Sequence, residues 1–386
     1  MQKSDSTSRF SSGVKIQMRK IFVLLIFGFS IIQGLVVYLT ELLGSNSPYQ
    51  LSEWLINYEA GFIRRGFSGS LYLAFFPSGQ NGLYVLAFLL FLITLIPQYV
   101  TLIWLEKVGF NWSCIAITCS PAFLVFAGWD IGAFGRKEWI AYSAISLLLF
   151  TRLKPLNEFY FRFTCVSASL LFLVGVLCWE PTFLLIPLFL TLLYRPLDES
   201  KKLFCRYLSV LTLASCSVAF LASVLSSTRE NASSYMCAAI REKGIQADEV
   251  CAQALFWLSK SSFYAIKATF SVLDQNSVYL PLLLLSLLPI VTIVNKRIVS
   301  RKIALLLPLV ILFIIGQDYG RWINILVTAT TFLIMSSSKF DFGNKSWTSI
   351  STILYTTMWA LPHAAHNDRF ENGGIGLFSR LINIFL

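Results

Sequence analysis

The sequence predicts an all-α, polytopic membrane protein with about eleven transmembrane helices, within a range of about nine to twelve. Of its 386 residues, 56% are hydrophobic and only 13% are charged, whereas soluble domains carry roughly 25% charged residues. Apolar runs of about 18 to 24 residues recur along the chain, and this is the length that crosses a bilayer. The polar stretches between them are too short for a separate soluble core, so residues 1–386 are expected to form a single integral membrane domain.

The first apolar run follows a polar and basic stretch, residues 1–19, and extends to about residue 43. It is longer than the apolar part of a cleavable signal peptide and lacks a small-residue cleavage site after it. We therefore expect a first span with a cytoplasmic basic tail. The eleven expected spans are 20–43, 82–105, 111–128, 139–153, 163–178, 182–195, 207–226, 278–295, 303–316, 322–336 and 347–361.

The distribution of charge predicts the orientation. With the N-terminus inside, the inner segments carry 19 Lys and Arg against 6 Asp and Glu, and the outer segments carry 12 against 14. Such a bias is typical of membrane proteins, whose cytoplasmic loops are enriched in Lys and Arg. The basic loops therefore account for the net charge of +11 as topology determinants, and no nucleic-acid partner is expected.

Two outer segments are larger than simple turns. Residues 44–81 include a short apolar stretch, 67–76, which suggests an interfacial or re-entrant helix. Residues 227–261 contain Cys237 and Cys251, which would form a disulfide in an oxidising compartment or remain two free thiols. The other six cysteines lie in or beside spans, where they are expected to act as small apolar residues.

Four charged clusters lie at the outer ends of spans, where a charge is costly unless it has a partner or a task. In the first, Arg64 and Arg65 lie between two glycines and follow Glu59. Two adjacent guanidiniums bind phosphate groups well through bidentate hydrogen bonds. The alternative is that both arginines only reach the phosphates of membrane lipids.

The second cluster is a tight turn that carries Asp130, Arg136, Lys137 and Glu138. Its charges would bind substrate or merely neutralise one another. In the third, Glu180 lies between Trp179 and a proline at the junction of two apolar runs. Glu180 is a candidate general base, and the alternative is a solvated acid in a hairpin turn.

The fourth cluster is a short outer turn with Asp318 and Arg321 three residues apart. The dipole of the helix that begins there would assist anion binding beside Arg321. The last outer segment holds His363 and His366, which we interpret as part of a polar tail because no third metal ligand is evident. No cofactor or resident metal is predicted, although acids near a pyrophosphate would be able to recruit Mg²⁺.

This layout resembles the O-antigen and capsular polysaccharide polymerases of bacterial surface-glycan gene clusters. The features that carry the resemblance are Arg64-Arg65-Gly66, Gly135 to Glu138, Glu180, Asp318 to Arg321, and the loop 227–261. The resemblance implies a multi-pass protein of the bacterial inner membrane that polymerises lipid-linked oligosaccharide repeat units on the periplasmic side. Its substrates would be linked to undecaprenyl pyrophosphate, as in lipopolysaccharide assembly, and its partners would include membrane lipids and a chain-length regulator or other glycan-assembly proteins.

The resemblance also suggests a role for each site residue. The pyrophosphate would contact Arg64, Arg65, Arg136, Lys137 and Arg321, and the candidate proton acceptors are Glu180, Asp318, Asp130, Glu138 and Glu59. A looser resemblance is to multispan glycosyltransferases that use polyprenyl-phosphate sugars, in which Glu53 or Glu59 would be the acid of the first outer loop. A third alternative is a non-enzymatic flippase or transporter of lipid-linked sugars.

Overall fold

The structure is a computed structural model that describes residues 5–362 with gaps at 44–48, 131–132, 195–198, 227–230, 247, 259–261, 272–274, 294–302 and 338–346. The described part of the chain is helical and contains no strand. Four helices are long and apolar enough to cross a membrane: α1 (Asp5–Leu43), α4 (Gln80–Val108), α8 (Glu158–Cys178) and α10 (Lys202–Leu225). The high apolar fraction of the sequence therefore forms membrane-compatible helices.

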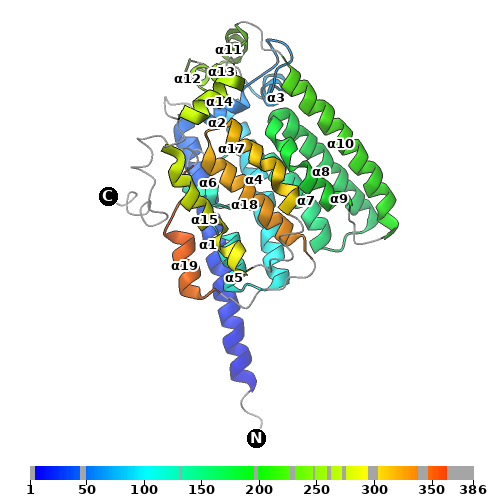
Figure 1. The fold of residues 1–386 in the computed structure, drawn as a ribbon, viewed down its shortest axis with the longest axis vertical. Coiled ribbons are helices and arrows are strands. Elements are labelled where there is room, and N and C mark those ends of the chain that lie inside the picture. The colour runs from blue at the N-terminus through cyan, green and yellow to red at the C-terminus, as the bar shows by residue number, and fades with distance from the viewer. Residues whose placement is uncertain are drawn as a thin grey trace.

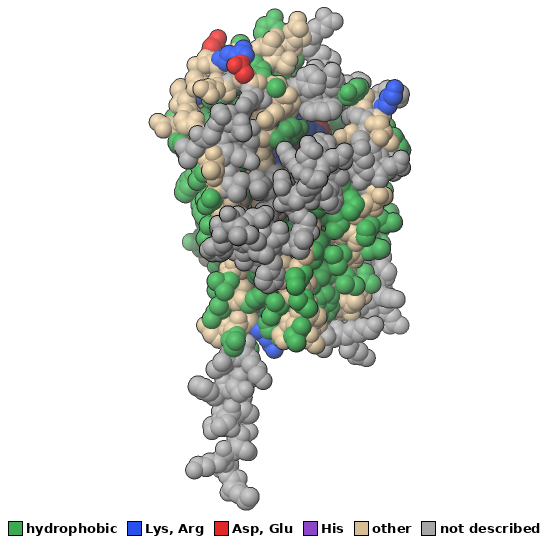
Figure 2. Space-filling model, turned by 90° about the vertical axis from the view of Figure 1, so that its left-hand side faces the viewer, with side chains coloured by type: hydrophobic (Ala, Val, Ile, Leu, Met, Phe, Trp, Pro, Cys, Tyr) green, Lys and Arg blue, Asp and Glu red, His purple; other side chains and the backbone are tan. Residues whose placement is uncertain are grey.

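The outer surface of these helices is suited to lipid. Large apolar side chains on α10, among them Val210, Leu211, Val218 and Leu221, are more than half exposed. Figure 2 shows that hydrophobic side chains cover much of the described surface below the upper end, whereas charged side chains gather mainly at that upper end. An exposed apolar surface of this extent is expected where lipid takes the place of water.

Shorter helices complete the bundle near most of the other expected spans. They are α7 (Glu138–Leu153), η2 (Glu180–Leu185) with α9 (Ile186–Tyr194), α15 (Tyr279–Ile293), η5 (Ile303–Ile311) with α17 (Leu312–Ile315), and α18 (Tyr319–Met335). Helix α7 packs against α4 and α8, and α10 packs against α8 and α9. Helix α18, at the centre of Figure 1, contacts α7, α15 and η5, and almost all of its residues are buried.

The expected span 111–128 is not one continuous helix. The structure divides it into α5 (Trp112–Thr118) and α6 (Phe126–Trp129), and a buried turn containing Pro121 joins them. Asn324 on α18 donates hydrogen bonds to the carbonyl oxygens of Ala122 (3.0 Å) and Phe123 (2.9 Å). A broken helix is tolerated in a membrane protein when its freed backbone groups are bonded inside the protein, and the Asn324 amide does this here.

The expected span 347–361 is also shorter than predicted. Helix α19 covers only Ser349–Thr357, and Thr348 caps its N-terminus in a capping box with Ser351. The predicted polar tail with His363 and His366 lies outside the described residues.

Contacts at both ends show that α1 and α4 run in opposite directions. At one end, Lys20 forms an ion pair of 2.7 Å with Glu106, so the beginning of α1 lies beside the end of α4. At the other end, the Gln80 side chain donates a hydrogen bond to the Leu42 carbonyl oxygen. The N-terminus lies at the lower end in Figure 1 and helices α11 to α13 at the upper end. The side of the membrane that each end faces, and the number of crossings, remain predictions from the charge distribution.

The two larger segments that the charge distribution places outside are folded. Residues 44–81 include α2 (Tyr49–Trp54) and α3 (Phe67–Phe75), the second of which coincides with the expected interfacial helix. Residues 227–261 form α11 (Ala232–Glu242), α12 (Asp248–Ala252) and α13 (Ala254–Leu258), followed by α14 (Ser262–Ser271). Two short turns, η3 (Glu199–Lys201) and η4 (Gln275–Val278), precede α10 and α15.

We expect Asn324→Ala to lower the free energy of unfolding by about 3 kcal/mol, because it leaves two buried carbonyl groups and the Tyr142 hydroxyl without their partner. The measurement is thermal unfolding of the purified protein in detergent. Thr330→Ala is the control, since the Thr330 hydroxyl bonds only to the Leu326 carbonyl of its own helix. Equal melting temperatures for the two variants would contradict this account of the broken helix.

Candidate functional site

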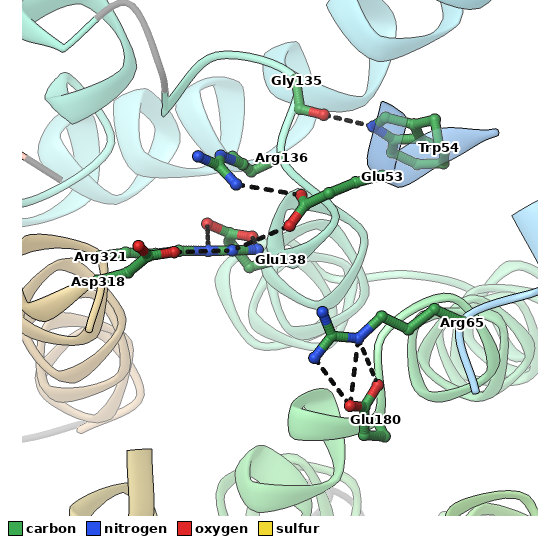
Figure 3. A network of polar contacts seen from close by, with 9 residues as sticks. All are labelled: Glu53, Trp54, Arg65, Gly135, Arg136, Glu138, Glu180, Asp318 and Arg321. Carbon is green, nitrogen blue, oxygen red and sulfur yellow. Dashed lines mark hydrogen bonds and ion pairs between the residues drawn. The ribbon is translucent and has the colours of Figure 1, made fainter. Parts of the chain in front are cut away.

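Charged side chains from three distant segments form one network at the end of the bundle where α1 ends and α2 begins (Figure 3). Glu53 on α2 lies 3.2 Å from an Arg136 nitrogen and 3.5 Å from an Arg321 nitrogen. Arg321, in the first turn of α18, donates two hydrogen bonds of 2.9 and 2.7 Å to the two carboxylate oxygens of Glu138. Asp318 lies 3.6 Å from the same guanidinium. The Arg321–Glu138 pair thus joins the second and fourth clusters directly, and Glu53 bridges their two arginines.

The centre of this network is almost completely buried. The side chains of Glu53, Arg136, Glu138 and Arg321 are only 3–4% exposed, whereas Asp318 is 32% exposed. Removing one partner of a buried ion pair typically costs about 3–5 kcal/mol, because the remaining charge stays buried without compensation. The four buried groups therefore hold their positions mutually, and Asp318 is the carboxylate that solvent or a ligand reaches most easily.

A second ion pair joins Arg65 to Glu180. The Arg65 Nε donates to both carboxylate oxygens, at 2.8 and 3.1 Å, and Nη2 donates at 2.8 Å. This bidentate geometry belongs to the stronger class of charge-assisted hydrogen bonds. It fixes the chain before α3 to the start of η2, so the first and third clusters also meet.

The backbone around Arg65 is constrained. Arg65 has a φ of +66°, in the left-handed region that non-glycine residues rarely adopt. The next residue, Gly66, lies so close to Tyr58 that a Cβ atom would be 2.3 Å from its ring. Such strained conformations are often found at binding and catalytic sites. The glycine-flanked Arg64-Arg65 pair is therefore held in a tight turn and not in a free loop.

Gly135 places the second cluster in a turn as well. Its φ of +71° turns the chain just before Arg136, and its carbonyl oxygen accepts a hydrogen bond from the Trp54 indole. This bond attaches the start of α7 to α2, the helix that carries Glu53 (Figure 3).

Lys137 occupies an interior position. It is fully buried, its ammonium group lies 3.4 Å from the Arg65 carbonyl oxygen, and it faces the Trp54 ring at 5.7 Å. Burial lowers the pKa of Lys137 to about 8, despite the opposing influence of Glu53 and Glu180. Lys137 therefore lies behind Arg65, from where it would support the turn more directly than it would contact a substrate.

Two tryptophans enclose Arg321. Its guanidinium carbon lies 4.6 Å from the Trp179 ring centre and 5.7 Å from the Trp322 ring centre. The two indoles lie nearly parallel, with their ring centres 6.2 Å apart. Cation–π contact offsets part of the cost of burying this charge. Because Trp179 immediately precedes Glu180, the same contact connects the two ion-paired groups.

The remaining predicted site residues are less closely tied to these pairs. Arg64 is partly buried and lies near enough to Arg65 and Glu180 to interact with their charges. No hydrogen bond or ion pair joins its guanidinium to the described residues. Glu59 is exposed, and Asp130 is nearly buried at the end of α6, close enough to Tyr279 to interact with it electrostatically.

Glu53 is the residue whose role was least evident in the sequence. It lies within a short segment of the first outer loop and is not adjacent to another charge. The sequence indicates its importance only in that an acid stands among the apolar residues Leu51, Trp54 and Leu55, where an unpaired carboxylate would be costly. Only the tertiary structure shows that it bridges Arg136 and Arg321.

The electrostatics of Glu53 are dominated by the two arginines. Burial by itself would raise the pKa of this carboxyl, but Arg136 and Arg321 lower it to about 2. Glu53 is thus ionised under all physiological conditions. It stabilises the arginines and is a poor proton acceptor.

A disulfide-linked unit holds α2 in place. Cys237 on α11 and Cys251 on α12 form a disulfide. The Ser52 hydroxyl donates to the Val250 carbonyl oxygen and accepts from the Ala254 amide, at 2.5 and 2.9 Å. Since Ser52 precedes Glu53, this unit fixes the helix that delivers the central carboxylate.

The described residues offer no evident metal centre. No group of three or more His, Cys, Asp or Glu side chains gathers as ligands within the described ranges. At the network, the carboxylates of Glu53, Glu138 and Glu180 face arginines. The chemistry of these groups is therefore suited to binding an anion beside arginines.

Comparison of the chain with protein families, with characterised proteins and with solved structures finds no match. The functional interpretation therefore depends on the geometry of the network.

Acid should destabilise the protein through Glu53. Because the pKa of Glu53 is about 2 in the folded protein and near 4.5 when unfolded, its contribution of roughly 3 kcal/mol is complete above pH 4.5 and is lost as the pH falls toward 2. We expect Glu53→Gln to unfold more easily at pH 7 and to lose less stability than wild type between pH 4.5 and 2. Thermal unfolding across this range tests it, with exposed Glu59→Gln as control; parallel curves for Glu53→Gln and wild type would contradict it.

The disulfide should contribute about 3 kcal/mol to stability, which is typical for a loop of this length. We expect Cys237→Ser combined with Cys251→Ser to melt at a lower temperature, and a reductant to lower the melting temperature of wild type to the same value. Cys216→Ser, at a buried free cysteine on α10, is the control that should leave the response to reductant unchanged. A wild-type protein insensitive to reductant would show that the bond does not contribute.

Proposed function

We propose that the chain is a membrane glycosyltransferase that polymerises oligosaccharide repeat units linked to undecaprenyl pyrophosphate. The observation that carries the proposal is the meeting of four charged clusters at one end of the bundle (Figure 3), with Arg64 and Asp318 left available to a ligand. The reaction needs stabilisation of a departing pyrophosphate and deprotonation of a sugar hydroxyl. Arginines suit the first task and a carboxylate suits the second.

The leaving group would bind first to Arg64. Its guanidinium has no hydrogen-bonded partner among the described residues, so it is able to take two phosphate oxygens without breaking an existing pair. Arg65 is adjacent and would exchange part of its contact with Glu180 for the phosphate. Arg136 and Arg321 are buried and contribute positive potential without direct access to the ligand.

Accessibility ranks the three candidate proton acceptors that are paired with arginines. Asp318 is 32% exposed, Glu180 is 13% exposed, and Glu138 is 3% exposed. Glu138 and Glu180 each accept two or more hydrogen bonds from an arginine, whereas the ion pair of Asp318 within the described residues is a longer contact of 3.6 Å with Arg321. Asp318 is therefore the best-placed general base, with Glu180 second.

In the proposed reaction, the growing glycan on undecaprenyl pyrophosphate is the donor, and a new lipid-linked repeat unit is the acceptor. A hydroxyl oxygen at the non-reducing end of the acceptor forms a bond to the anomeric carbon of the donor. The bond from that carbon to the pyrophosphate oxygen breaks, and its electron pair leaves with the pyrophosphate. Asp318 receives the hydroxyl proton.

The proposed location is the bacterial inner membrane, with the site facing the periplasm. The positive charge of the opposite loops supports this orientation. The disulfide between Cys237 and Cys251 lies in the unit that binds Ser52 of α2 beside the site, and disulfides persist in oxidising compartments such as the periplasm. Charges gathered at one end favour chemistry at the membrane surface over a flippase, which needs polar groups along a path through the bilayer.

We expect Arg64→Ala and Asp318→Asn to abolish glycan polymerisation while the protein accumulates and melts like wild type. Arg65→Ala and Arg321→Ala should abolish it as well, with Arg321→Ala also losing about 3–5 kcal/mol of stability because Glu138 and Glu53 remain buried. A gel of surface glycan and a melting curve measure both effects. Arg241→Ala, an exposed arginine of the same outer end paired with Asp248, is the matched control.

The same gel distinguishes the polymerase from the alternative functions. In cells without the gene, a ladder that collapses to one repeat unit on lipid A–core supports the polymerase. Loss of all glycan with a truncated lipid-linked intermediate would point to a transferase that acts earlier and uses a monophosphate donor. Complete repeat units stranded on the cytoplasmic leaflet would favour a flippase, and an unchanged ladder would exclude surface-glycan assembly.

A further inference from the structure

Tyr49 is a polar group at the site that the reaction described above does not use. It is the first residue of α2, and its ring lies over the Arg136 guanidinium, with 5.2 Å between the guanidinium carbon and the ring centre. Although it touches the buried network, the residue is 37% exposed. Tyr49 therefore forms part of the boundary between the charged interior and the outer surface.

The charges around Tyr49 come from both ion-paired groups. Its hydroxyl interacts electrostatically with Glu53 on its own helix, Asp318 before α18, Arg136 before α7, and Arg65 before α3. Burial, together with Glu53 and Asp318, raises the pKa of Tyr49 to about 12, so the phenol keeps its proton at physiological pH. No hydrogen bond joins the Tyr49 hydroxyl to the described part of the chain.

The helix that carries Tyr49 is firmly attached. Ser52 binds the disulfide-linked unit, Glu53 binds two arginines, and Trp54 binds the Gly135 carbonyl. All three contacts lie within five residues of Tyr49. A phenol on such a rigid element is suited to fixing the orientation of a ligand.

Among the described residues, most polar groups of the network bind one another, and three are the least engaged: the Arg64 guanidinium, the Asp318 carboxylate with its single 3.6 Å ion pair, and the Tyr49 hydroxyl. The first attracts an anion, and the second accepts a proton. The third donates one hydrogen bond and accepts another. A sugar ring carries neighbouring hydroxyls that need both a donor and an acceptor, which Tyr49 and Asp318 supply together.

We propose that Tyr49 is a substrate-binding residue that holds the acceptor sugar, donating a hydrogen bond to an oxygen next to the hydroxyl whose proton Asp318 takes. This inference rests on the proposed function. It identifies the acceptor as a polyhydroxylated ring that binds beside α2, on the Asp318 side of the site. Tyr319, which follows Asp318 and stacks on Tyr279 with ring centres 5.7 Å apart, provides an aromatic face on that side.

Tyr49→Phe is the informative variant, because it removes only the hydroxyl and keeps the ring over Arg136. With purified protein in proteoliposomes, and lipid-linked repeat units extracted from the same cells as substrate, we expect the apparent KM for the repeat unit to rise about tenfold. A rise of this size corresponds to the loss of one hydrogen bond. The kcat at saturating repeat unit should stay within a factor of two of wild type.

Two matched variants give the comparison. Tyr84→Phe, on α4, removes a hydroxyl from a tyrosine that is 36% exposed and should leave the KM unchanged. Asp318→Asn should lower kcat, so the reaction rate should fall at every concentration of the repeat unit. Stabilisation of the protein by inorganic pyrophosphate, measured as a shift in melting temperature, should persist in Tyr49→Phe and disappear in Arg64→Ala.

The outcomes separate this inference from the proposed function. A collapsed glycan ladder in the deletion strain, together with a wild-type KM for Tyr49→Phe, would overturn the role of Tyr49 and leave the polymerase standing. A fall in kcat without a change in KM would overturn it too, because that result places Tyr49 in the chemical step and not in acceptor binding. An unchanged ladder in the deletion strain would overturn the proposed function and this inference with it.

Discussion

The burial of Arg321 between two carboxylates is the constraint on which the rest of the site depends. Its guanidinium is removed from water, and the energy lost is recovered only if Glu138 and Glu53 stay within reach. This requirement fixes α2, α7 and α18 relative to one another at the outer end. Arg136 completes the balance by pairing with the second oxygen of Glu53. Tyr49 and Asp318, at the starts of α2 and α18, therefore occupy positions that these buried charges determine.

The aromatic rings extend this constraint to the second ion pair. Trp179 lies against Arg321, and the following residue, Glu180, holds Arg65. A shift of η2 would therefore disturb both the cation–π contact and the bidentate pair. Arg65, in its left-handed conformation, is held from one side by Glu180 and supported from the other by the Lys137 ammonium at its carbonyl oxygen. The two groups thus behave as one unit, and the adjacent Arg64 has no hydrogen-bonded partner in the described part of the chain.

Much of this arrangement follows from the sequence, because a charge at the end of an apolar run is costly unless it has an oppositely charged partner or faces water. The clusters around Arg65, Arg136, Glu180 and Arg321 were predicted to lie together for that reason. Which acid would face which arginine was not predictable, since pairing depends on tertiary contacts between segments up to 268 residues apart. Glu53 shows this limit most clearly. The break in the helix expected at 111–128 was equally unpredictable from the sequence, because the Asn324 amide that binds its free carbonyl groups lies on a different helix.

The distance along the chain between Glu53 and Arg321 has a consequence for biogenesis. During synthesis, Glu53 is made long before Arg321, its partner on α18. Ser52 is likewise made before Val250 and Ala254, to which it binds. Until then the carboxylate has to remain hydrated, which a position in an outer segment allows and a position at mid-bilayer would not. Final assembly is therefore a late, post-insertional event. A chain that ends before α18 would leave Glu53 and Glu138 without Arg321, so their carboxylates would have to stay hydrated.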